Sequence, residues 1–163
     1  MNAPNEALLR QVLASPEPRA RANGIRMLFH WQDRIDNSFE LFASAIEDEH
    51  PRVRLETVNA LREIGSLEFA NIAIRALNRP MDRWLDYATW LAARELRDDW
   101  LPALQSGMEV FGGSPHQLRF ALEATGDPRA TARLVALLRN SKISENDTPN
   151  VVKTIAGLGK APE

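Results

Sequence analysis

The sequence predicts an all-α protein, an α-solenoid of about five helix pairs, and three observations support this fold class. Prolines recur along the 163 residues, apolar residues follow them at helical spacing, and alternation of apolar with polar residues never lasts for the length of a strand. A period of about 33 residues is typical of proteins built from stacked helix pairs. The prolines are Pro18, Pro51, Pro80, Pro115 and Pro149, at intervals of 33, 29, 35 and 34 residues.

Each of these prolines is predicted to open the first helix of a pair, where its missing amide hydrogen costs nothing. The apolar residues agree with this register, because they fall four, seven and ten residues after each of the first three prolines. Such spacing places them on one helix face, which we expect to be buried. The residues in these slots are Ala22, Ile25 and Leu28, then Leu55, Val58 and Leu61, then Trp84, Tyr87 and Trp90.

The second helix of each pair is predicted to begin at a small polar residue. The predicted starts lie near Asn37, Ser66, Asp99 and Asp127. Asn37 and Glu40 have the spacing of a capping box, in which two side chains satisfy each other's amide groups at a helix start.

Two serine or threonine residues precede the later prolines and are expected to act as N-caps, in Ser114-Pro115 and Thr148-Pro149. Residues 4–14 carry an apolar stripe ahead of the first proline and resemble the second helix of a preceding repeat. We therefore expect residues 1–163 to form a single repeat domain that is a segment of a larger protein.

Charge and composition exclude several classes of protein. Twenty basic and 22 acidic residues nearly cancel over the chain, which argues against non-specific binding to nucleic acid. The absence of cysteine excludes disulfides, thiolate metal sites and cysteine nucleophiles within these residues. The longest apolar run, residues 134–138, is far shorter than the roughly 20 residues that span a bilayer. We expect no membrane association, and the start of the chain does not have the features of a signal peptide.

Two runs of residues carry a recognisable family pattern. They are residues 48–61, Asp-Glu-His-Pro-Arg-Val-Arg-Leu-Glu-Thr-Val-Asn-Ala-Leu, and residues 126–138, Gly-Asp-Pro-Arg-Ala-Thr-Ala-Arg-Leu-Val-Ala-Leu-Leu. The first run resembles the first helix, and the second run the second helix, of HEAT-like helical repeats of the PBS-lyase type. The matching positions are packing, turn and capping residues, so the resemblance implies the fold of nearly the whole chain and says little about its partner.

A narrower resemblance involves residues 80–96, 100–104 and 111–115. These segments are similar to the HEAT segment of large exported multidomain proteins from planctomycete-type bacteria. In those proteins the segment accompanies a dehydrogenase-like propeller and a c-type haem domain with a Cys-x-x-Cys-His motif. The resemblance implies a spacer domain in a periplasmic or exported protein, and without it a cytoplasmic location is expected.

Four aromatic residues, Trp84, Tyr87, Trp90 and Trp100, form the first candidate for a recognition site. The favoured interpretation is a core role, because the first three occupy the slots that hold aliphatic residues in the preceding repeat. Nearby charged residues are expected to pair between helices or to line a binding face; these are Asp82, Arg83, Asp86 and Arg94. The candidate binding surface is therefore Arg83, Arg94 and Trp100.

No catalytic, cofactor-binding or metal-binding residue is identified from the sequence. His30, His50 and His116 are too far apart to form a local metal motif, and Gly112-Gly113 lacks the spacing of a phosphate-binding loop. The leading hypothesis is a non-catalytic scaffold whose second helices line a concave surface. The alternatives are the spacer domain described above and a nucleic-acid-binding HEAT-like domain, which would need arginines gathered on one face.

The expected partner is another protein or a neighbouring domain of the same chain, with no nucleic acid and no cofactor. We expect the isolated chain to be mainly monomeric, with weak self-association through the apolar faces of its terminal helices.

Overall fold

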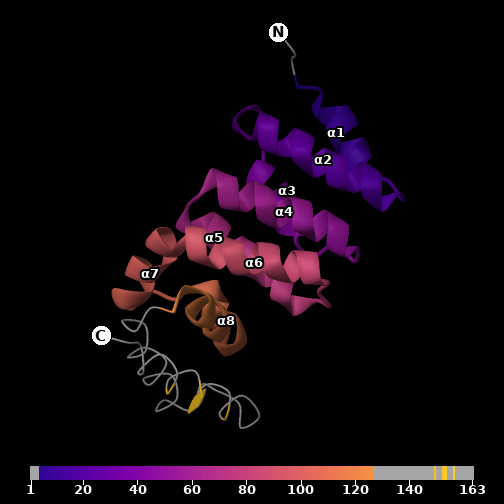
Figure 1. Cartoon of the computed structure of the whole chain (residues 1–163). Coiled ribbons are helices and arrows are strands. Elements are labelled where there is room, and N and C mark those ends of the chain that lie inside the picture. Colours follow the sequence, from indigo (N-terminus) through magenta and orange to yellow (C-terminus); the bar gives the residue numbers. More distant parts are fainter. Residues whose placement is uncertain (1–3, 127–148, 150–151, 154–155, 157–163) are drawn as a thin grey trace.

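The helices stack in pairs from one end of the molecule to the other (Figure 1). The computed structural model describes residues 4–126, 149, 152–153 and 156, and these contain α-helices and short 3-10 helices but no strand. The prediction of an all-α solenoid is therefore confirmed for this part of the chain. The predicted helix start near Asp127, the Thr148 cap and most of the fifth helix pair fall outside the described residues.

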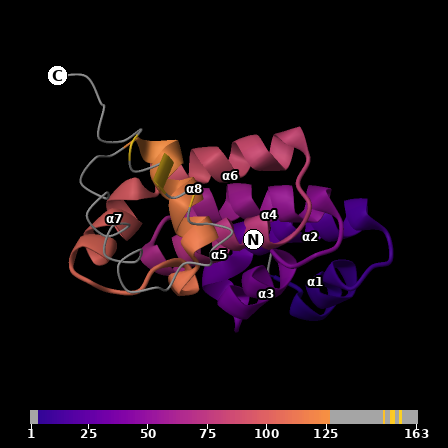
Figure 2. The ribbon, with the colours of Figure 1, turned by 90° about the horizontal axis from the view of Figure 1, so that it is seen from below.

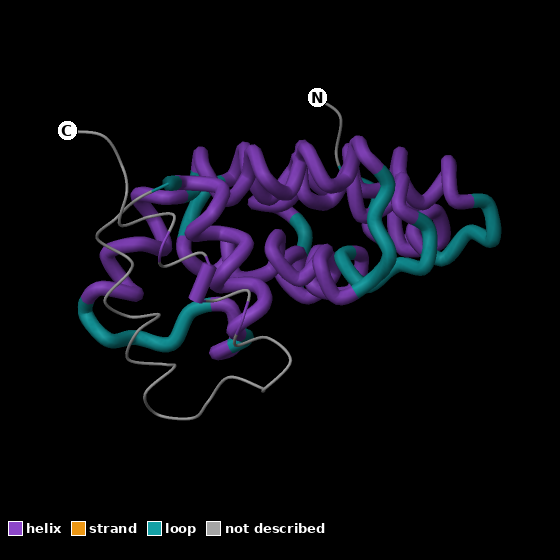
Figure 3. Tube along the Cα trace, turned by 60° about the horizontal axis from the view of Figure 1, so that its bottom comes forward, coloured by secondary structure: helices purple, strands orange, loops and turns teal. Residues whose placement is uncertain are grey.

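The helices form two layers (Figures 2 and 3). The first helices lie in one layer, and each contacts the next along the chain. In Figure 2, α2, α4 and α6 lie side by side with α1, α3 and α5 below them. The first helices are α2 (Pro18–Trp31), α4 (Pro51–Ile64), α6 (Arg83–Glu95) and α8 (Pro115–Thr125); the others are α1 (Glu6–Leu13), α3 (Ser38–Ala45), α5 (Leu67–Ala73) and α7 (Arg97–Gln105). Three 3-10 helices complete the path, η1 (Gln32–Arg34), η2 (Ile74–Asn78) and η3 (Phe111–Gly113).

Three first helices begin at a proline, as predicted. The proline follows a capping side chain that accepts a hydrogen bond from a backbone amide of the first turn. The capping residues are Glu17 before α2, His50 before α4 and Ser114 before α8. The N-cap expected at Ser114 is thus confirmed.

The prediction that Pro80 opens a helix is wrong. The first helix of the third pair, α6, begins at Arg83. Its N-cap is Asp82, whose side chain accepts hydrogen bonds from the amides of Trp84 at 3.0 Å and Leu85 at 2.8 Å. The first helices therefore start at residues 18, 51, 83 and 115, at intervals of 33, 32 and 32 residues. The structural repeat is more regular than the spacing of the prolines.

The starts of the second helices differ from the expectations in detail. Ser66 caps α5 as predicted, and its side chain accepts from an amide one turn later. Asn37 precedes α3 in the left-handed region, at φ 60°, and makes no capping hydrogen bond through its side chain. The predicted capping box with Glu40 is therefore wrong. Asp99 lies in the first turn of α7, which begins two residues earlier.

Because α6 begins three residues after Pro80, its buried face is not the one that the sequence predicted. Counted from the helix start, Val53 of α4 corresponds to Leu85 of α6, and Thr57 corresponds to Thr89. All four side chains are buried. The prediction that Trp84, Tyr87 and Trp90 belong to the core is wrong, since these side chains are 59%, 59% and 36% exposed.

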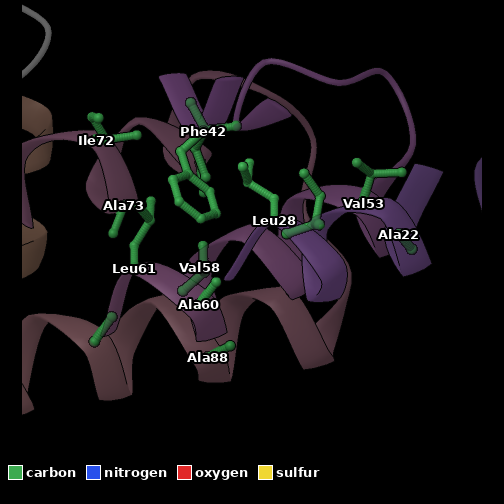
Figure 4. Close-up of a cluster of buried hydrophobic side chains, with 14 of the residues drawn as sticks. Ala22, Leu28, Phe42, Val53, Val58, Ala60, Leu61, Ile72, Ala73 and Ala88 are labelled. Carbon is green, nitrogen blue, oxygen red and sulfur yellow. The ribbon is translucent and has the colours of Figure 1, made fainter. Parts of the chain in front are cut away.

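Two hydrophobic clusters make up the core. In the N-terminal cluster, Leu28 of α2, Phe42 of α3 and Val58 of α4 are fully buried between the two layers (Figure 4). The C-terminal cluster surrounds Trp100 of α7, whose ring centroid lies 5.4 Å from that of Phe111. Stacking each helix pair on the next therefore buries apolar surface on both sides of α4 and α6.

The seventh position of the first helices α2, α4 and α6 is buried. At Gly24 of α2 an added Cβ would lie 2.9 Å from Cδ2 of Leu13 in α1, closer than such atoms approach. Thr57 and Thr89 occupy the same position in α4 and α6. Their hydroxyl groups are buried, and each donates to the carbonyl four residues earlier, at 2.9 Å and 2.8 Å.

Arginine at the fourth position of α2 joins two interhelical turns. The Nη1 of Arg21 donates to the carbonyls of Ser15 at 2.9 Å and Pro16 at 3.3 Å, and its Nε and Nη2 bind the carboxylate of Asp48. Burial alone would raise the pKa of Asp48, but the hydrogen bonds from Arg21 and from the His50 amide outweigh it and hold the pKa below its usual value. The Arg21–Asp48 pair thus links the turn before α2 to the turn before α4.

Arg54 repeats this arrangement one repeat later. Its Nη1 donates to the carbonyls of Asp48 at 2.6 Å and Glu49 at 3.1 Å, six and five residues earlier in the chain. Arg21 binds the carbonyls of Ser15 and Pro16 at the same two separations. Its Nη2 donates to the carbonyl of Pro80, in the segment before α6. The side chain is 1% exposed, and burial lowers the pKa of its guanidinium.

Replacing Arg54 with alanine should reduce the free energy of unfolding by about 3 kcal/mol, because three carbonyls lose a charged donor and the buried space is left unfilled. Urea denaturation of the purified variant measures this loss. Arg52→Ala is the matched control, since Arg52 lies on the same helix with a half-exposed side chain and an ion pair to Glu56. That pair should contribute no more than about 1 kcal/mol. Equal losses in the two variants would contradict a structural role for Arg54.

Candidate functional site

The strongest candidate for a binding surface lies on the exposed side of α6. Trp84, Tyr87 and Trp90 follow one another at intervals of three residues, and Arg83 and Arg94 stand at the two ends of the row. We call these five residues the aromatic strip. Aromatic side chains exposed together on one helix are unusual for a soluble surface and are the residue types that dominate binding energy at interfaces.

The side chains of the strip make stacking contacts in two groups, Arg83 with Trp84, and Tyr87 with Trp90 and Arg94. The guanidinium carbon of Arg83 lies 4.3 Å from the ring centroid of Trp84, and that of Arg94 lies 4.7 Å from the ring centroid of Trp90. The rings of Tyr87 and Trp90 are stacked, with centroids 5.8 Å apart and planes at 21°. Each exposed contact between a cation and a ring contributes about 0.5–1 kcal/mol, which favours the observed positions of the Trp84 and Trp90 rings modestly.

The two predicted surface arginines are both exposed, and they differ in their hydrogen bonds to other residues. Arg94 donates through Nη1 to the carbonyl of Ala124 at 2.9 Å and so connects α6 to α8. Arg83 makes no hydrogen bond or ion pair with any residue that the structure describes, and its guanidinium rests on the ring of Trp84.

Trp100 cannot contribute to the candidate binding surface, contrary to the sequence interpretation, because it is buried. Its side chain is 0% exposed, and its indole Nε1 donates to the carbonyl of Ala93 at 2.9 Å. Trp100 is an anchor of the C-terminal core. The aromatic cluster of the sequence therefore separates into one core residue and three surface residues.

The charges around the strip are nearly balanced. Arg83 and Arg94 are offset by Asp82 and Asp86, which lie in the same stretch of chain. The ion pairs that join neighbouring repeats are found elsewhere along the first helices: the Arg26–Glu56 pair links α2 to α4 and the Arg62–Glu95 pair links α4 to α6. A strip without excess positive charge has no electrostatic basis for binding a polyanion.

A hollow of about 630 Å³ lies at the N-terminal ends of α2 and α4. Its most prominent cations are Arg26 and Arg52, and both bind the carboxylate of Glu56, at 2.6 Å and 2.9 Å. Glu17 and His50 also line the hollow, and their side chains accept hydrogen bonds from the amides of Arg19 and Arg52 at the starts of α2 and α4. The hollow has the character of a solvated interface between repeats.

A second hollow, of about 610 Å³, lies against α5, η2 and the start of α8. Its amide side chains are partly engaged: Asn71 Oδ1 accepts from the amide of Phe111 at 2.7 Å, and Gln117 Nε2 donates to Asn78 Oδ1 at 2.7 Å. The Oε1 of Gln117 is buried without a partner among the described residues. No residue of the aromatic strip lines either hollow.

Among the residues that the structure describes, no three histidine, cysteine or carboxylate side chains converge as metal ligands would. The three histidines occupy separate places: His30 in the last turn of α2, His50 at the N-cap of α4 and His116 in the first turn of α8. Within the same part of the chain, no helix combines the length and the apolar character that crossing a membrane requires.

The stacked helix pairs define a helical-repeat solenoid, and comparison with known families identifies which one. A model of HEAT repeats matches residues 6–97, more than half of the chain. The chain therefore belongs to the HEAT-repeat family, as the sequence resemblance implied. Proteins of this family generally act as non-enzymatic scaffolds that mediate protein interactions. No curated protein and no solved structure matches the chain.

Substitution of two tryptophans should lower the free energy of unfolding by very different amounts. Trp100→Ala should lower the free energy of unfolding by about 3–5 kcal/mol, because it empties the centre of a core cluster. Trp84→Ala should lower it by less than about 1 kcal/mol, since the ring is mostly exposed. Chemical denaturation followed by circular dichroism measures both. A loss from Trp84→Ala as large as that from Trp100→Ala would show that the α6 rings are core residues after all.

Proposed function

We propose that the chain is a non-catalytic scaffold that binds a protein partner through the aromatic strip of α6. The observation that supports this most is the exposure of three large aromatic side chains on one helix. A fully covered aromatic side chain buries roughly 150–250 Å², and 59% of Trp84, 59% of Tyr87 and 36% of Trp90 remains open to a partner. Leaving such apolar surface in water is unfavourable. Tryptophan, tyrosine and arginine are also the residue types most enriched among the dominant contacts of protein interfaces.

The equivalent positions of α4 indicate that the strip is a special feature of α6. Leu55 and Val58 correspond to Tyr87 and Trp90 when residues are counted from the helix start, and both are at least half-buried. The repeat architecture therefore does not itself require exposed aromatic residues at these positions.

A narrower role, as a spacer in an exported multidomain protein, has support from the sequence resemblance of residues 80–96, a range that includes the strip. In that case a neighbouring domain of the longer chain would cover the strip. The nucleic-acid-binding alternative has less support, because Asp82 and Asp86 offset the two arginines of the strip.

Selection from a random peptide display library tests the proposal while the partner itself is unidentified. We expect the folded protein to enrich peptides whose binding falls at least tenfold when Trp84, Tyr87 and Trp90 are all replaced with alanine. The reason is that the three rings supply most of the apolar surface available to a ligand on α6. Biolayer interferometry with the enriched peptides measures the change.

Phe39→Ala and Met108→Ala serve as controls, since both side chains are exposed and apolar but lie on other segments. The enriched peptides should bind these variants as they bind the unmodified protein. The proposal fails if the peptides bind the triple variant normally, or if they lose binding equally in the controls. Circular dichroism of the triple variant verifies that it remains folded.

A further inference from the structure

We propose that the hollow against α5, η2 and the start of α8 is a second binding site, which holds an uncharged polypeptide segment in an extended conformation through its backbone. This site is separate from the aromatic strip and goes beyond the proposed function. Its volume of about 610 Å³ lies within the roughly 300–1,000 Å³ of typical ligand pockets. Three amide side chains line it, Asn71, Asn78 and Gln117, and their hydrogen bonds indicate which ligand groups it accepts.

The carboxamide of Asn71 offers a donor to the hollow. Its Oδ1 accepts a hydrogen bond from the backbone amide of Phe111 at 2.7 Å. A backbone amide can only donate, so this bond identifies the oxygen of the carboxamide and leaves the nitrogen as the other atom. The Nδ2 of Asn71 makes no hydrogen bond to any described residue. A carbonyl oxygen is therefore the ligand group that this side chain can bind.

Gln117 offers an acceptor. Its side chain is 5% exposed, its Nε2 donates to Oδ1 of Asn78 at 2.7 Å, and its Oε1 is buried without a partner among the described residues. Leaving such an acceptor unsatisfied costs about 1–3 kcal/mol, so a donor that reaches it is bound favourably. Because Oε1 has almost no contact with water, a donor reaches it when the carboxamide turns about its last bond, a torsion with a broad energy profile in glutamine.

An extended backbone carries both ligand groups at a suitable separation. Asn71 and Asn78 lie seven residues apart along α5 and η2, about 12 Å along the helix axis, and both face the hollow. Four residues of an extended chain span about 13 Å. Carbonyl and amide groups follow one another along the edge of such a chain, and both are free to bond to a protein. A segment of about five residues can therefore bring a carbonyl to Asn71 and an N–H group to Gln117.

The wall and the charges of the hollow suit an uncharged segment. Phe39 lines it with a side chain that is 41% exposed and a ring centroid 5.7 Å from that of Phe69. Alternate side chains of an extended chain face the same way, so an apolar row can lie against Phe39. The charged lining residues are one acid, Glu68, and one base, Arg75, which binds Glu47 at 2.8 Å. Neutral amide groups therefore dominate recognition at this site.

Nuclear magnetic resonance titration of the whole chain with the peptide acetyl-Thr-Val-Thr-Val-Thr-amide tests the inference, because side-chain amide signals report each carboxamide separately and detect weak binding. We expect the signals of Asn71 and Gln117 to shift and that of Asn23, exposed on α2, to stay in place. A comparison peptide with every backbone nitrogen methylated should bind at least tenfold less tightly, since it has no backbone donor. Raising the salt concentration from about 50 to about 500 mM should change the affinity less than about twofold, because neutral groups are not screened.

Two substitutions test the two amide groups. Asn71→Asp keeps the oxygen that the Phe111 amide requires and replaces the Nδ2 donor with an oxygen that repels a carbonyl. We expect it to weaken peptide binding at least fivefold, whereas Asn23→Asp, the control for the added charge, should leave binding unchanged. Gln117→Leu removes the buried acceptor and keeps a similar volume, so binding should also fall at least fivefold. Circular dichroism verifies that the variants remain folded.

The results that overturn this inference differ from those that overturn the scaffold proposal. The inference fails if the amide signals of Asn71 and Gln117 do not shift, or if the methylated peptide binds equally well. Equal effects of Asn71→Asp and Asn23→Asp, or normal binding by Gln117→Leu, also overturn it. The triple variant of the aromatic strip should bind the pentapeptide normally. Library-selected peptides that lose binding in Asn71→Asp but not in the triple variant belong to the hollow, and the remaining peptides decide the scaffold proposal.

Discussion

The buried guanidinium of Arg54 joins two interhelical segments, and the surface of the molecule depends on where α6 begins after the second of them. Arg54 binds the carbonyl of Pro80 and holds the segment before α6 against the turn before α4. Asp82 then caps a helix that starts at Arg83. From this start, Leu85, Ala88 and Ala92 turn toward the neighbouring helices and the aromatic rings turn toward solvent. The contact of Arg54 with Pro80 thus lies just before the helix that both packs into the core and exposes the aromatic strip.

Sequence reasoning identified the architecture because proline, capping residues and apolar spacing all report on single helices. It failed on α6 because this helix has two apolar faces. Counting from Pro80 selects the face of Trp84, Tyr87 and Trp90, whereas counting from Asp82 selects the face of Leu85 and Ala88. Only packing decides between them: the close approach of neighbouring first helices admits alanine and threonine, and three large rings do not fit there. Asp82, a strong N-cap residue, was the local signal that indicated the correct start.

Sequence spacing was limited in the same way at the candidate binding surface, because it does not show which side chains are packed against other segments. Arg83 and Arg94 could be assigned to the surface from the sequence, because long charged side chains are seldom buried. Trp100 could not be separated from the other aromatic residues, because its burial depends on Phe111 and on the carbonyl of Ala93, contacts between segments that sequence spacing does not reveal. The balance of charge was informative throughout. Of the fourteen arginines among the described residues, at least seven bind carboxylates or carbonyls of other segments, and the most distinctive surface of the described repeats is aromatic rather than cationic.

The central claim is that α6 presents its tryptophans to solvent while α7 buries its own. Nuclear magnetic resonance of the indole amide hydrogens in the presence of a soluble paramagnetic agent tests this claim most directly, because attenuation reports the solvent exposure of each ring separately. The signals of Trp84 and Trp90 should be strongly attenuated, and that of Trp100 should be protected and exchange slowly, since its indole donates to Ala93. Protection of Trp84 and Trp90 equal to that of Trp100 would contradict the account.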